Sequence, residues 1–164
     1  MSQKCKNLES QAKTLLKEDP LKAKDTYINA AECYNKNFKK KDYKKVMIKA
    51  IKILQDYCKP LDPFKGREYI EEAAKYYEKL ELKEESNSIM ISLADKFADY
   101  AKKIEKSNLN LVNAIKYFLS AEELYLEYGI EQKYQDCTIS AYNICALLGI
   151  TLERIFQYFQ KKAE

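Results

Sequence analysis

Apolar and small residues recur along the chain every three or four positions, the spacing that places them on one face of an α-helix. The clearest example lies in residues 111–125, with a stripe made of Leu111, Ala114, Ile115, Phe118, Ala121 and Tyr125. The two alanines leave room for a neighbouring helix backbone, and Phe118 fills the space between them. We therefore expect one helix here, packed closely against others.

Similar stripes occur in three other places, which indicates an internal repeat. They are Ala23, Tyr27, Ala30 and Tyr34; Gly66, Ile70, Ala73 and Tyr77; and, more weakly, Leu152, Ile155, Phe156 and Phe159. Counted from the first small position, successive copies are 43, 48 and 41 residues apart. Residues 19–23 and 62–66 also share the pattern Asp-Pro-x-Lys-small, in which Asp caps a helix and Pro occupies its first turn.

A second set of helices is expected between the repeated ones. Their apolar stripes predict helices over residues 3–17, 43–57, 87–103 and 133–148. Residues 35–41 are expected to form a short polar connection, and residues 84–88 to supply the N-cap of the helix that starts near residue 87. Gly129 and Gly149 predict helix ends, and Thr151 predicts a cap. The resulting fold class is all-α: a right-handed solenoid of about four antiparallel helical hairpins, forming a single domain over residues 1–164.

The amino-acid composition favours a helical protein and argues against a metal-binding, membrane-spanning or nucleic-acid-binding one. The 164 residues include only three Gly and three Pro, and neither His nor Trp. The five cysteines have no metal-binding spacing, so reduced thiols are expected. We expect a cytoplasmic protein, because the N-terminus lacks an apolar run and no segment approaches the ~20 apolar residues of a membrane span. A net charge of +4 without an aromatic stacking motif does not indicate nucleic-acid binding.

Residues suited to catalysis are scarce, so we expect no enzymatic activity, metal, cofactor or small-molecule substrate. Histidine, the usual general base, is absent. Acidic pairs such as Glu71-Glu72 and Glu122-Glu123 stand among lysines, where solvated ion pairs explain them better than catalysis. The three isolated glycines form no phosphate-binding loop. The cysteines near apolar stripes are expected in the core: Cys33, Cys137 and Cys145.

Three segments carry a resemblance to a known family. The spacing Ala114-Ile115-x-x-Phe118-x-x-Ala121 resembles the second helix of a tetratricopeptide repeat. Over residues 20–148 a closer resemblance is to the soluble NSF attachment proteins (SNAPs), carried by residues 114–125, by residues 73–77 with 84–88 and Leu93-Ala94, and by Ala30-Ala31-x-x-Tyr34. This resemblance implies an adaptor in vesicle fusion and transport, which binds the SNARE four-helix bundle with its concave face and recruits an NSF-type ATPase.

A lysine cluster interrupted only by Asp42 supplies the candidate partner-binding residues: Lys36, Lys39, Lys40, Lys41, Lys44, Lys45 and Lys49. The last three begin the first helix of a hairpin, which lines the concave side in tetratricopeptide-like solenoids. An acidic SNARE bundle would be attracted there, as would an anionic membrane to which the protein binds peripherally, and both attractions would weaken with salt. A solvated turn and helix face without a partner explains the cluster equally well.

A rival hypothesis for the function is a generic scaffold whose groove binds a peptide or helix of an unrelated partner. The two hypotheses predict different ligands. A SNAP-like protein would bind folded helical bundles, and a scaffold would bind short linear segments.

Overall fold

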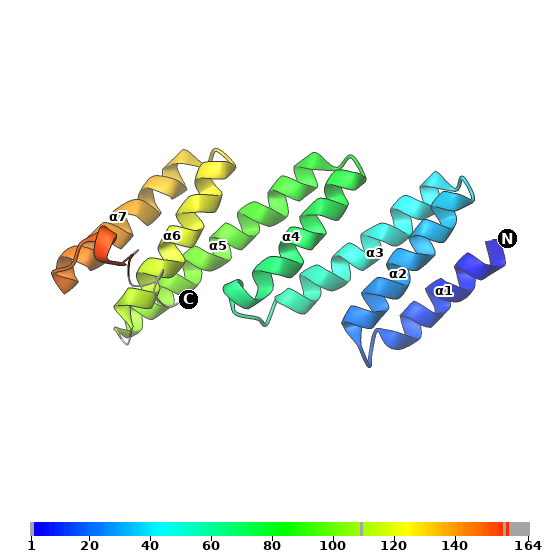
Figure 1. The fold of residues 1–164 in the computed structure, drawn as a ribbon, viewed down its shortest axis with the longest axis horizontal. Coiled ribbons are helices and arrows are strands. Elements are labelled where there is room, and N and C mark those ends of the chain that lie inside the picture. The colour runs from blue at the N-terminus through cyan, green and yellow to red at the C-terminus, as the bar shows by residue number, and fades with distance from the viewer. Residues whose placement is uncertain (1, 109, 156, 158–164) are drawn as a thin grey trace. The chain divides into compact units, whose positions relative to one another are not determined.

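The computed structural model describes residues 2–108, 110–155 and 157 of the chain, and they are almost entirely helical (Figure 1). Seven helices run in order along this part of the chain: α1 (Ser2–Leu15), α2 (Pro20–Lys36), α3 (Lys40–Cys58), α4 (Pro63–Lys79), α5 (Lys83–Ser107), α6 (Leu111–Glu127) and α7 (Glu131–Leu148). A further helical stretch follows at residues 152–155. The predicted all-α class is confirmed.

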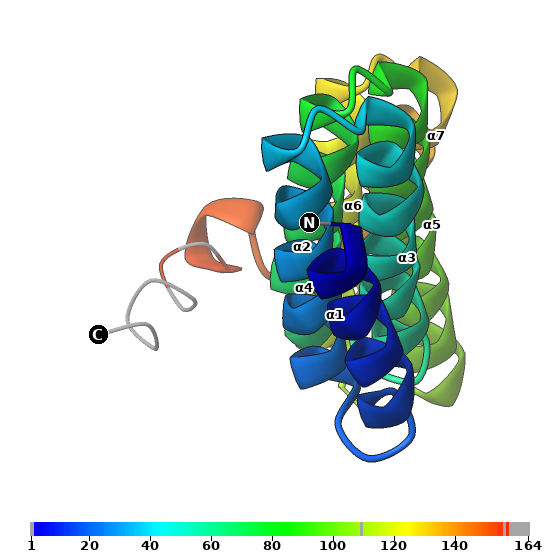
Figure 2. The ribbon, with the colours of Figure 1, turned by 90° about the vertical axis from the view of Figure 1, so that its right-hand side faces the viewer.

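The chain divides into two compact units, Met1–Ile89 and Met90–Glu164. In the first unit α1 packs on α2, α2 on α3, and α3 on α4. Figure 2 shows α2 and α4 in one layer of this unit and α3 in another. In the second unit α6 packs on α7. Neighbouring helices thus pack as hairpins, while the single domain and the right-handed solenoid stay predictions.

The repeated Asp-Pro pairs start helices as predicted. The Asp19 carboxylate accepts a 3.0 Å hydrogen bond from the Lys22 N–H, and the Asp62 carboxylate accepts one of 2.9 Å from the Phe64 N–H. A proline follows each cap at the first helical position, where its missing N–H costs nothing. These caps fix the starts of α2 and α4 in corresponding places.

The small and aromatic stripes form the cores of both units. In α2 they bury Ala23, Tyr27, Ala30, Ala31 and Tyr34, and in α6 they bury Ala114, Ile115, Phe118, Ala121, Leu124 and Tyr125. Helix α3, which packs on α2, buries Ala50, Ile51 and Leu54 completely. The prediction that alanines allow close helix contact is consistent with their complete burial.

Two helices begin earlier than predicted. Helix α3 starts at Lys40, inside the predicted connection 35–41, and α5 starts at Lys83, before the predicted N-cap residues 84–88, so residues 40–41 and 84–88 are helical. In α5 the Ser86 hydroxyl does not cap the helix; it is buried and donates a 3.2 Å hydrogen bond to the Ala74 carbonyl of α4. Glu84 and Glu85 lie in the first turn, where carboxylates favour a helix start. Phe156 and Phe159 of the weak fourth copy lie outside the described residues.

A disulfide between Cys5 and Cys33 corrects the prediction of reduced thiols. It joins α1 to α2, with the two Cα atoms 5.5 Å apart. A sequence separation of 28 positions conceals this pair in the sequence, and the packing of α1 on α2 brings the two cysteines together. Buried thiols remain at Cys58, Cys137 and Cys145.

Candidate partner-binding site

The structure gathers the predicted lysines around the start of α3. Lys36 lies in the last turn of α2, Lys39 precedes α3, and the others follow within α3. Six of the seven are exposed, and none of these six forms an ion pair within the described part of the chain: Lys36, Lys39, Lys40, Lys41, Lys44 and Lys45. Their ammonium groups therefore face solvent with no ion-pair partner among the residues described.

Lys49 differs from the rest of the cluster because it is already engaged. Its ammonium lies 2.7 Å from the Glu9 carboxylate of α1 and 5.6 Å from the centre of the Tyr27 ring. Burial favours the neutral form of Glu9, but hydrogen bonds from Lys49 and Tyr34 outweigh it and lower the pKa of this carboxyl. Lys49 thus ties α3 to α1, and its prediction as a partner contact stays untested.

A further lysine belongs to the exposed face of α3. Lys52 follows Lys45 by seven residues, and Lys45 follows Lys41 by four, so the three side chains lie on one side of the helix. Like the other two, Lys52 is exposed and makes no ion pair among the residues described. The run of neighbouring lysines ends before residue 52, so only helical spacing could have identified it from the sequence.

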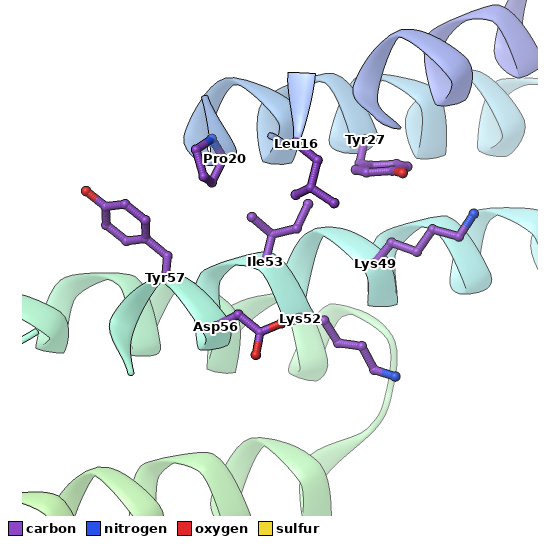
Figure 3. A pocket seen from close by; sticks show the side chains of 8 residues that line it. All are labelled: Leu16, Pro20, Tyr27, Lys49, Lys52, Ile53, Asp56 and Tyr57. Carbon is purple, nitrogen blue, oxygen red and sulfur yellow. The ribbon is translucent and has the colours of Figure 1, made fainter. Parts of the chain in front are cut away.

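Next to this face lies a pocket of about 420 Å³ (Figure 3), lined by Leu16, Pro20, Tyr27, Lys49, Lys52, Ile53, Asp56 and Tyr57. Figure 3 shows Leu16 and Ile53 directed toward one another across the pocket. Leu16 follows α1 and is 42% exposed, so part of this apolar side chain faces solvent. The sequence did not indicate this pocket, because its walls come from three separate segments.

The charged groups of the pocket all come from α3. Lys52 offers a positive charge to solvent, whereas Asp56 accepts a 2.5 Å hydrogen bond from Lys59. Apolar walls beside a basic helix face suit a bulky apolar side chain whose neighbours are acidic. The arrangement can bind a protein surface.

The second unit has a more polar pocket of about 450 Å³, lined by Asp95, Ala98, Asp99, Lys102, Phe118, Tyr125, Lys133, Asp136, Cys137 and Ser140. Its central acid is engaged, because Asp95 accepts 2.6 Å hydrogen bonds from both Tyr125 and Lys133. Burial raises the pKa of the Cys137 thiol to about 11, so this thiol is protonated and a poor nucleophile at neutral pH. Lys133 and Asp95 of this pocket form an ion pair with each other.

The described residues contain no group of three or more acidic or cysteine side chains placed to hold a metal ion. No helix among them combines the length and apolar character needed to cross a membrane. Comparison of the chain with protein-family models, curated proteins and solved structures gives no match.

Proposed function

We propose that this protein is an adaptor that binds the acidic face of a helical partner through α3 of its first unit. The observation that carries the proposal is the pairing of exposed, unpaired lysines on α3 with an apolar pocket at their side. Complementary charge steers a partner toward such a surface, and a buried apolar anchor then slows its dissociation.

The resemblance to SNAPs gives the proposed partner a chemical identity. An assembled SNARE four-helix bundle presents acidic residues on a folded helical surface, which complements the α3 lysines. Within this proposal the hairpins form a right-handed solenoid, the α3 face lies on its concave side, and the protein acts in the cytoplasm and recruits an NSF-type ATPase.

A charge-reversal comparison tests the proposal. The variant Lys44→Glu/Lys45→Glu/Lys52→Glu should bind an assembled SNARE bundle at least about tenfold more weakly than the unaltered protein, because three attractive charges become repulsive. Its matched control is Lys65→Glu/Lys75→Glu/Lys83→Glu, which makes the same change in net charge at exposed positions of α4 and α5. Equal binding by both variants would refute the assignment to α3.

The pocket also supports the rival function, a scaffold for linear peptides, because a volume of this size accommodates one bulky side chain. Both functions use this pocket, so Leu16→Ser, which removes an apolar wall and leaves the lysines intact, should weaken both kinds of binding. Salt distinguishes the two. Binding to an acidic bundle should weaken as the salt concentration rises, whereas a peptide held by the apolar walls should lose little affinity.

A further inference from the structure

The turn between α2 and α3 carries an aromatic side chain that the fold does not use. Phe38 is 94% exposed, the highest value among the large apolar side chains described, and Leu147 follows at 73%. Its backbone is left-handed, with φ of 58°. An aromatic residue is unfavourable in that conformation, which glycine adopts freely. Phe38 is therefore unfavourable for the stability of the fold in two ways: its apolar side chain is exposed to solvent and its backbone is strained.

The equivalent turns of the other repeats show what the fold needs at this position. Residues four places after the repeated tyrosines Tyr34, Tyr77 and Tyr125 are Phe38, Glu81 and Gly129, and all three have positive φ. In each turn the next N–H donates to the tyrosine carbonyl, over 3.0, 2.9 and 2.8 Å. The backbone geometry is thus shared, while only the first repeat places an aromatic residue there.

The residue after each left-handed position also differs. Leu82 and Ile130 follow in the second and third repeats, where an apolar side chain can fold back onto the preceding helix. The first repeat has Lys39 instead. The first repeat thus has an exposed lysine in place of the apolar residue, and an exposed aromatic ring at the left-handed position.

Four exposed lysines surround the aromatic ring in sequence: Lys36, Lys39, Lys40 and Lys41. None of them forms an ion pair with the described residues. The cap residue Lys39 provides no side-chain acceptor to the first turn of α3, whose positive end adds to the lysine charge. We define residues 36–41 as the basic turn.

A lipid surface fits the basic turn better than a protein surface does. A protein interface needs an apolar core that extends over several residues, and every neighbour of Phe38 from 35 to 41 is polar. A single exposed ring among lysines matches a bilayer, where the ring enters the headgroup boundary and the ammonium groups meet lipid phosphates. We propose that the basic turn docks the protein on an anionic membrane surface, with Phe38 inserted.

This inference goes beyond the proposed adaptor function, and its test is independent of any protein partner. The full chain would be sedimented with vesicles of phosphatidylcholine alone and with vesicles that contain about 30 mol % phosphatidylserine. Binding is expected only to the anionic vesicles. The variant Phe38→Gly should bind about tenfold more weakly, with a thermal midpoint equal to or above that of the unaltered protein.

Two further variants test whether the lysine charges are needed for binding and whether an exposed phenylalanine elsewhere on the protein is sufficient for it. Reversing the four lysines to glutamate should abolish sedimentation. Glu81→Phe places the same ring in the equivalent turn of the second repeat and should not increase binding, because Glu84 and Glu85 begin the helix that follows. Full binding by Phe38→Gly would overturn the inference and leave a purely electrostatic contact, and so would a failure of the unaltered chain to sediment.

The absence of tryptophan from the chain allows a direct reading of insertion. In the variant Phe38→Trp the emission of the single indole should shift to shorter wavelength when anionic vesicles are added, and lipids that carry a quencher should reduce it. The opposite result would overturn the membrane assignment in favour of a protein contact: an indole emission that shifts when an assembled helical bundle is added but does not shift when vesicles are added.

Discussion

The Tyr34 hydroxyl of α2 donates a 2.8 Å hydrogen bond to the Glu9 carboxylate of α1. The same carboxylate binds Lys49 of α3, so one acid joins three successive helices. The second unit repeats this arrangement. Tyr125 of α6 donates a 2.6 Å hydrogen bond to Asp95 of α5, which also binds Lys133 of α7. A tyrosine–acid–lysine cluster thus joins three successive helices in each unit.

The cluster predicts an acid-dependent loss of stability in the first unit. The pKa of Glu9 is lowered in the folded protein, so its contribution to the unfolding free energy is complete above the ordinary value of 4.5 and disappears as the pH falls through the folded value. The variant Glu9→Gln should lose about 0.5–1.5 kcal/mol at neutral pH. Urea unfolding at neutral and acid pH measures both effects.

At low pH the unfolding free energies of the unaltered protein and of Glu9→Gln should become equal. Protonation of Glu9 removes from the unaltered protein the charge that the variant lacks. A constant difference between them from neutral to strongly acid pH would show that the Glu9 charge does not stabilise the fold.

Gly66 offers a stabilising substitution. An added Cβ would lie 3.5 Å from the Cβ of Cys58, an ordinary van der Waals distance, and the residue lies within α4. Alanine should therefore raise the unfolding free energy by about 0.5–1 kcal/mol, because it restricts the unfolded chain and favours the helix. Thermal and urea unfolding of Gly66→Ala measure this gain. A loss of stability would mean that α3 and α4 approach more closely here than the structure indicates.

Ala121 is expected to tolerate no larger side chain. It is fully buried on the face of α6 that also buries Phe118 and Leu124. The variant Ala121→Leu should lose about 1–3 kcal/mol of unfolding free energy through overpacking. Ala146→Leu serves as the matched control, since Ala146 is exposed on α7. If the two variants were equally stable, the close contact at Ala121 would be disproved.

The disulfide predicts a redox-dependent stability. A bond that closes a loop of 28 residues restricts the unfolded chain, and its reduction should lower the unfolding free energy by about 2–4 kcal/mol. Urea unfolding with and without a thiol reductant gives this difference, and Cys5→Ser/Cys33→Ser should match the reduced protein. Mass spectrometry after alkylation of the unfolded, unreduced chain should find three modified cysteines. Five would contradict the bond.

Local rules were sufficient to predict most of the helices. The Asp19 and Asp62 caps and the alanine stripes act within a few residues of sequence, so their effect could be anticipated. The start of α5 could not, because the buried Ser86 hydroxyl finds its partner in another helix. Residue type alone suggested a cap there, and tertiary packing decided otherwise.

The candidate site was only partly predictable for the same reason. The lysines were evident as a run, but their partners depend on neighbouring helices: Lys49 meets Glu9 across 40 residues of sequence. The pocket wall at Leu16 and the exposure of Phe38 also depend on how helices meet. Sequence periodicity reports one helix at a time and gives no information on these contacts.

Binding of the unaltered protein to an assembled SNARE four-helix complex tests the adaptor proposal most directly. Calorimetric titration would be performed at about 50 mM and about 200 mM salt, between which screening of exposed charges increases substantially. We predict specific binding that weakens several-fold at the higher salt, and no comparable binding to the isolated linear segments. Absence of binding at either salt, or equal affinity for the linear segments, would contradict the proposal.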